Sequence, residues 1–169
     1  MKKIYLYLAI TIASCLLFSC SKESLTKKNL EGTWGLTHYE SYDKVDGEVM
    51  NQEKGDCNPY APVGDDDLKF VIINTTGNDY LVTPYFWDKK KSMWTTSSSD
   101  KMTWTIKGNK IYYSEGVDEG QPFQLTSDSL TLEGTYQTES EGWWYGKEGE
   151  VQVVHYSKYV FRKMSDLSE

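Results

Sequence analysis

The chain has 169 residues, of which 25% are charged and 14% aromatic, and its net charge at pH 7 is −7. This acidic balance excludes a nucleic-acid-binding role, because such proteins neutralise phosphates with Lys and Arg. The aromatic content excludes a disordered chain and favours a β-protein, since Trp, Tyr, Thr and Val pack well on a pleated surface.

The N-terminus carries the pattern of an export signal. Two lysines precede an apolar run over residues 4–18. This run is shorter than the roughly 20 apolar residues of a membrane-spanning helix, so residues 1–19 are predicted to be a cleaved signal peptide. The box Leu-Phe-Ser-Cys at 17–20 resembles that of bacterial lipoproteins. The resemblance implies cleavage before Cys20 and acyl chains, palmitate among them, on that residue. The alternative is ordinary secretion, with Cys20 free or in a disulfide.

A lipid anchor at Cys20 would place the protein in the cell envelope, in the outer membrane, with the periplasmic or surface face left open. Residues 20–28 are polar and are expected to be a tether. Removal of the signal takes two of the 18 basic residues and no acidic one, leaving 16 against 25 and a net charge of −9. We interpret this charge as favouring solubility. It also argues against attraction to anionic lipid surfaces. The membrane contact is therefore assigned to the acyl chains.

Cysteine usage follows from this processing. Cys15 leaves with the signal and Cys20 is acylated, so Cys57 stands alone and the domain has no internal disulfide. We expect Cys57 to be buried or partly buried. The alternatives are a reactive thiol and an intermolecular partner.

Residues 29–164 are long enough for one domain with a real core, followed by a polar tail at 165–169. Residues 43–67 are rich in Gly and acidic residues and contain Pro59 and Pro62, which predicts a long loop or lid. Alternation and turn signals such as Gly108-Asn109 predict about eight short strands and no long helix. Pro84 indicates an edge or bulge in its strand. The expected strands cover residues 34–42, 68–73, 80–87, 93–96, 101–107, 111–114, 122–126, 129–137 and 151–164.

The start of this domain, Gly32-Thr33-Trp34, resembles the first barrel strand of the lipocalin-like families. The order of later hairpins and the closing strand that ends Val160-Phe161-Arg162-Lys163 also match lipocalin-like lipoproteins of Gram-negative bacteria. The resemblance implies an all-β fold, a single antiparallel up-and-down barrel of about eight strands. It also implies that Trp34 packs at the closed end with Arg162 across it, a cation–π contact worth about 0.5–2 kcal/mol.

Catalytic and metal chemistry is sparse in this sequence. Gly-x-Ser-x-Gly, His-Glu-x-x-His and phosphate-loop motifs are absent. His38 and His155, on the first and last strands, could share zinc, but we favour two unrelated histidines. Asp65-Asp66-Asp67 could hold Ca²⁺, but a solvated acidic turn is favoured because the EF-hand spacing is missing. Cys57 is a weak candidate nucleophile. We expect no enzyme, no cofactor and no metal.

Gly142-Trp143-Trp144-Tyr145-Gly146 is the sharpest local feature of the chain. Three consecutive aromatic residues cannot all face one core, so at least one is expected to be exposed. Exposed aromatic surface marks binding sites, for sugars, membranes or partners. The alternative is that the three residues fold back and plug the mouth of the barrel.

Two functions compete at this stage. The first is a monomeric, non-catalytic envelope lipoprotein whose barrel binds a small apolar or amphipathic ligand. The second is a structural module that contacts protein or glycan partners, with a barrel filled by its own side chains. An eight-stranded barrel has room for either arrangement, and periodicity does not give its interior volume.

Overall fold

A computed structural model describes residues 29–64, 67–113 and 120–165 of the chain. The signal, the tether and Cys20 lie outside these residues. No helix in the described part is long and apolar enough to cross a membrane. The elements are β1 (Gly32–Val45), β2 (Glu48–Asp56), β3 (Leu68–Thr76), β4 (Asp79–Asp88), β5 (Met93–Thr95), η1 (Ser98–Asp100), β6 (Met102–Lys107), β7 (Lys110–Tyr113), β8 (Gln121–Leu125), β9 (Ser129–Glu141), η2 (Gly142–Tyr145) and β10 (Glu150–Met164), where η marks a 3₁₀ helix.

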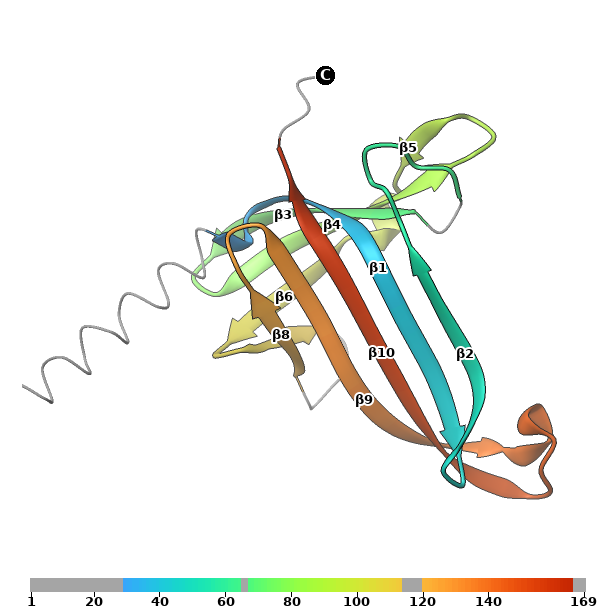
Figure 1. The fold of residues 1–169 in the computed structure, drawn as a ribbon. Coiled ribbons are helices and arrows are strands. Elements are labelled where there is room, and N and C mark those ends of the chain that lie inside the picture. Colours follow the sequence, from blue (N-terminus) through green and yellow to red (C-terminus); the bar gives the residue numbers. More distant parts are fainter. Residues whose placement is uncertain (1–28, 65–66, 114–119, 166–169) are drawn as a thin grey trace, which may run out of the picture.

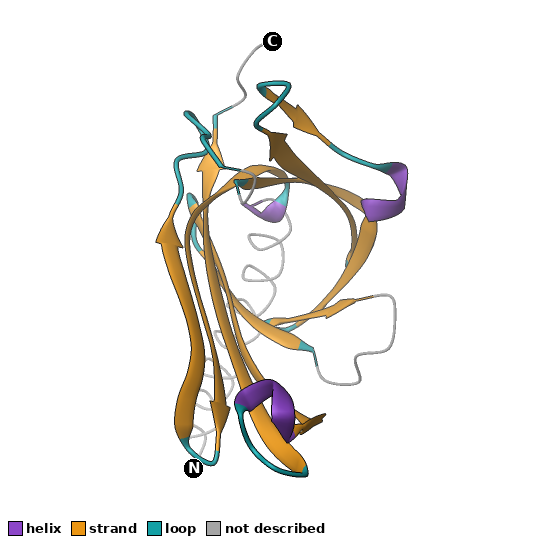
Figure 2. Cartoon of the chain, turned by 90° about the vertical axis from the view of Figure 1, so that its right-hand side faces the viewer, coloured by secondary structure: helices purple, strands orange, loops and turns teal. Residues whose placement is uncertain are grey.

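The strands form an antiparallel sheet that closes into a ring (Figure 2). Eight strands follow one another around it in the order β1, β3, β4, β6, β7, β8, β9 and β10, and β10 pairs with β1 to close it. Closure leaves the ring without a free sheet edge, which removes the usual template for aggregation. The expected up-and-down barrel of about eight strands is confirmed.

Four strand segments continue beyond the barrel as a sheet that we call the extension (Figure 1). It consists of residues 38–45 of β1, all of β2, residues 133–141 of β9 and residues 150–158 of β10. β1 lies between β10 and β2, and β10 between β1 and β9. The extension therefore joins the first and last strands of the chain far outside the barrel core.

β2 corrects the prediction of a loop or lid over residues 43–67. Its nine residues are mostly exposed and polar, so the hydrophobic alternation that identifies a half-buried strand is missing. Backbone pairing with β1 holds it in place. Asp46 and Gly47 join the two strands with φ angles of 52° and 82°. This Asp-Gly pair is a hairpin signal that the loop interpretation overlooked.

The interior of the barrel is packed with aromatic and aliphatic side chains. The Phe70 ring contacts Trp104 edge-on at a centroid distance of 5.6 Å and lies 4.9 Å from Phe161. Trp34 and Trp104 are almost fully buried. The barrel proper therefore fills itself, as small barrels commonly do. The buried residues are Leu30, Trp34, Leu36, Phe70, Ile72, Tyr80, Val82, Trp104, Ile106, Ile111, Phe123, Leu130, Leu132 and Phe161.

Trp34 lies at the base of this core, and its indole Nε1 donates to the Leu30 carbonyl at 2.8 Å. The cation over its ring is Lys163, whose Nζ lies 5.3 Å from the ring centroid and donates to the Asn29 carbonyl at 2.9 Å. The prediction of Arg162 at this position is wrong by one residue. In the β1–β10 register, Trp34 pairs with Lys163, whereas Arg162 pairs with Gly35 and is exposed.

Candidate functional site

A pocket of about 510 Å³ opens where β9 leaves the barrel and enters the extension. β8 pairs with β9 only as far as Leu132, so the two strands separate beyond that point. Gly120 and Gly134 line the opening and carry no side chain to fill it. The remaining lining combines rings, neutral polar groups and one charge, and consists of Lys110, Tyr113, Gln121, Pro122, Thr135, Tyr136 and Ser157.

Tyr113 connects this pocket with the packed core. Its ring meets Trp104 edge-on at 6.1 Å, and its hydroxyl donates to Gln121 Oε1. Burial, with a smaller contribution from Tyr159, raises the pKa of Tyr113 to about 12. The phenol is therefore a neutral hydrogen-bond donor at physiological pH. Lys110 is the charged residue of the lining, so this opening in an acidic protein carries a positive group.

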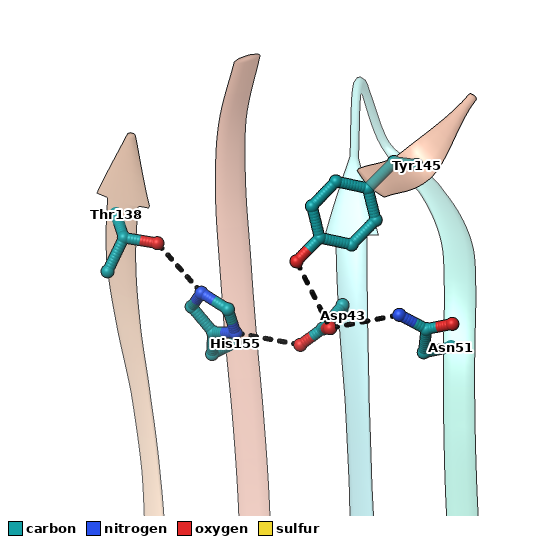
Figure 3. A network of polar contacts seen from close by, with 5 residues as sticks. All are labelled: Asp43, Asn51, Thr138, Tyr145 and His155. Atoms are coloured by element: carbon teal, nitrogen blue, oxygen red, sulfur yellow. Dashed lines mark hydrogen bonds and ion pairs between the residues drawn. The ribbon is translucent and has the colours of Figure 1, made fainter. Parts of the chain in front are cut away.

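A polar network lies beside the pocket on the extension (Figure 3). His155 Nδ1 is 2.7 Å from Asp43 Oδ1, and His155 Nε2 is 2.8 Å from Thr138 Oγ1. Asp43 Oδ2 also accepts from Asn51 Nδ2 at 3.2 Å and from the Tyr145 hydroxyl at 3.4 Å. These five side chains come from β1, β2, β9, β10 and η2. The network thus links every strand of the extension to the loop at its tip.

Strand periodicity places this network on the face that continues the barrel interior. Counting back by twos from the core residue Phe161, His155 projects from the same face of β10. Tyr136 pairs with His155 across the strands and stacks on its ring at 4.6 Å. Tyr136 also lines the pocket. It therefore joins the pocket and the network into one polar and aromatic surface.

The order hydroxyl, imidazole and carboxylate in Thr138, His155 and Asp43 is also that of acyl-transfer triads. Such a site further needs donors aimed at a developing oxyanion. The two other donors of the network, from Asn51 and Tyr145, are both directed at Asp43. The contacts account for a cross-strand link, and we assign no catalytic step to them.

The aromatic residues 143–145 lie on η2, at the far tip of the extension and away from the barrel core (Figure 1). The indoles of Trp143 and Trp144 stack on each other at 3.9 Å, and the residues are 62% and 68% exposed. Tyr145 turns inward to Asp43. The expectation that at least one of the three is exposed is therefore confirmed. The three residues do not plug the mouth of the barrel.

The two histidines do not form a shared site. His38 pairs with Val160 in the strand register, and His155 pairs with Asp43, five positions along β1. His38 Nδ1 instead lies 2.7 Å from Asp56 Oδ1. Within the described ranges, no group of three or more His, Cys, Asp or Glu is arranged to hold a metal ion.

The structure also shows the surroundings of Asp67 and Cys57, two residues considered in the sequence analysis. Asp67 is buried and accepts from the backbone N–H groups of Val63 and Gly64 at 2.7 and 2.9 Å, so it closes a turn. Residues 65 and 66 lie outside the described part. Cys57 is partly buried and packs against the core, as expected.

Comparison with known protein families identifies the family of this chain. A family model described as a lipocalin-like domain matches residues 30–132, which is more than half of the chain. The chain belongs to the lipocalin-like domain family. None of the curated proteins matches it significantly.

One solved structure similar to this lipocalin-like chain is a multidomain protein including DUF1735 from Bacteroides ovatus. The two are 10% identical, with a TM-score of 0.33 over 79% of this chain and 49% of that one. This lipocalin-like protein therefore spans about half the length of that structure.

Sequence patterns did not locate the pocket or the network of this lipocalin-like domain. The pocket arises where β8 and β9 separate, and its lining comes from four strands. Asp43 and His155 are 112 positions apart and meet only through the β1–β10 register. Gly134, inside β9, was the available signal, because a glycine inside a strand often marks a place where a ligand or another backbone approaches closely.

Proposed function

We propose that this protein is a membrane-anchored, non-catalytic envelope lipoprotein that binds one small amphipathic ligand in the pocket between β7, β8, β9 and β10. Cys20 would carry the acyl chains that hold it on the membrane. The proposal rests chiefly on the pocket, whose volume of about 510 Å³ is in the range of small-molecule sites. Two other hollows, of about 470 and 580 Å³, have similar volumes, but the lining of this pocket is the most apolar of the three. The barrel core, by contrast, is packed with buried aromatic and aliphatic side chains.

The lining suggests the chemistry of the ligand. The rings of Tyr113, Pro122 and Tyr136 offer apolar surface, whereas Gln121 and Ser157 offer neutral hydrogen-bonding groups. Lys110 is the charged group of the lining, and it favours a ligand with an anionic end. A single-chain amphiphile with a carboxylate has both features.

Titration calorimetry on the mature chain with Cys20→Ser tests this assignment. Decanoate and decanol are matched probes with and without the charge. Gly134→Phe would fill the pocket, and it should weaken binding of decanoate at least about tenfold, or 1.4 kcal/mol. Gly134→Ala is the control, because the nearest atom to its added Cβ is a Gln121 carbon at 3.6 Å, an ordinary contact.

The charge is tested separately. Lys110→Met should weaken binding of decanoate and leave binding of decanol unchanged. Lys101→Met, at an exposed position just before β6, should change neither. If neither probe binds, or if Gly134→Phe binds both like the wild type, the pocket is not a ligand site for single-chain amphiphiles.

The second candidate function is a structural or interaction module. The self-filled barrel favours it, because the core leaves the fold stable without a ligand. In that case the wild type and Gly134→Phe would bind no amphiphile, and recovery of a crosslinked partner from the envelope would depend on exposed surface.

A further inference from the structure

The tip of the extension presents an aromatic platform that the proposed ligand pocket does not use. The platform consists of the stacked indoles of Trp143 and Trp144. More than 60% of each residue is exposed, and neither lines the pocket. Burying two such rings against a partner would release a large apolar area from water.

The loop that carries the platform is fixed to the extension. Gly142 N donates to the Gly149 carbonyl at 2.6 Å, and a Cβ on Gly142 would collide with that same oxygen. Gly146 ends η2 with a φ of 67°. Tyr145 reaches Asp43 on β1. The indoles are therefore displayed on an ordered support, which lowers the entropy lost when a partner binds.

Carboxylates are frequent in the loop that carries the platform and in the neighbouring turn. Glu141, Glu148 and Glu150 belong to the same loop and its flanks, and Asp46 and Glu48 come from the neighbouring β1–β2 turn. Lys147 lies on the same loop, and its Nζ is 3.5 Å from Glu48 and 4.0 Å from Asp46. Lys44, near the end of β1, places its Nζ over the Tyr42 ring. The tip is thus strongly acidic.

The tip also lies at the end of the extension opposite to the barrel, where β1 begins (Figure 1). The described chain enters the domain at that distant end (Figure 1), and the acidic residues of the tip repel anionic headgroups. Both observations disfavour the lipid surface as the occupant of the platform.

We propose that this platform binds a basic polypeptide segment, one that carries several Arg or Lys side chains. Cations are attracted to indole faces and to the carboxylates around them. The indoles stack on each other, so they offer one joint platform in place of two spaced rings for successive sugars. Two exposed indoles outside the described pocket suit a macromolecular partner, whereas small molecules bind in concave pockets.

Titration calorimetry at 150 mM salt tests the proposal on the mature chain with Cys20→Ser. The probe is the peptide acetyl-(Arg-Gly)₄-amide, and its control replaces each Arg by the neutral isostere citrulline. The arginine peptide should bind and the citrulline peptide should not. Trp143→Ala with Trp144→Ala should weaken binding at least about tenfold.

Matched variants separate the platform from general acidity. Phe86→Ala with Tyr60→Ala removes two exposed aromatic residues elsewhere and should leave binding unchanged. Glu148→Gln should weaken binding about twofold, whereas Glu53→Gln, at an exposed carboxylate on β2, should not. Urea unfolding of each variant confirms that the fold is retained.

Equal affinity in the double Trp variant and the wild type would overturn the proposal, because binding would then be a response to net charge. Absence of arginine-peptide binding would also overturn it. The proposal would also be overturned if Trp143 and Trp144 bound maltohexaose or phosphatidylglycerol vesicles and not the arginine peptide. These outcomes are independent of amphiphile binding, which is tested at Gly134.

Discussion

At the scale of single residues, side-chain contacts depend on strand register to the exact position. Trp34 was identifiable from the Gly-x-Trp pattern, and it is buried at the base of the core. Its cation was assigned to Arg162, but the register pairs Trp34 with Lys163. A slip of one residue moves a side chain to the other face of a sheet, and sequence periodicity alone does not fix it. The Asp43–His155 contact was out of reach for the same reason.

The contact at the base of the barrel gives the first residue-scale prediction. Lys163→Gln removes both the cation over Trp34 and the hydrogen bond of Nζ to the Asn29 carbonyl. It should lower the free energy of unfolding by about 1–2 kcal/mol. Arg162→Gln should change it by less than about 0.5 kcal/mol, because this side chain is exposed. Urea denaturation measures both, and equal effects of the two substitutions would refute the assignment.

At the scale of elements, strands with one buried face were predictable and the polar strand was not. β6 alternates buried Trp104 and Ile106 with more exposed residues, as its sequence predicts. β2 has no such alternation and exists through pairing with β1. Pro84 also behaves as predicted for an edge or bulge. On one side of β4, pairing with β6 ends at Val82 and pairing with β5 begins at Phe86. Pro84 lies between these two points, so on that side it has no partner strand that would need its missing N–H.

Asp43 offers a prediction at this scale, because its carboxylate accepts hydrogen bonds that hold β2, β10 and η2 to β1. Asp43→Ala should lower stability by about 1–3 kcal/mol and leave His155 and Tyr145 without their acceptor. Hydrogen exchange should rise in η2 and along β2, while the barrel strands β3, β4 and β6 stay protected.

Glu53→Ala is the matched control, since this carboxylate lies on β2 outside the network and is exposed. It should leave exchange in η2 unchanged. If Asp43→Ala also left that exchange unchanged, Asp43 would not hold the loop to the extension.

At the scale of the whole molecule, the fold separates two surfaces. Buried side chains pack the barrel, and a pocket opens where β8 and β9 diverge. The extension carries the aromatic tip away from both (Figure 1). The up-and-down barrel was predictable from turn signals and alternating strands. The pocket was not, because it results from strand divergence and two glycines spread over the chain.

Native mass spectrometry of the protein purified from its own envelope tests the central claim most directly. The account predicts a chain that begins at an acylated Cys20 and retains one small anionic amphiphile, and it predicts loss of that ligand from Gly134→Phe purified in parallel. An acylated chain that retains no small molecule, or that retains it equally in Gly134→Phe, would contradict the account.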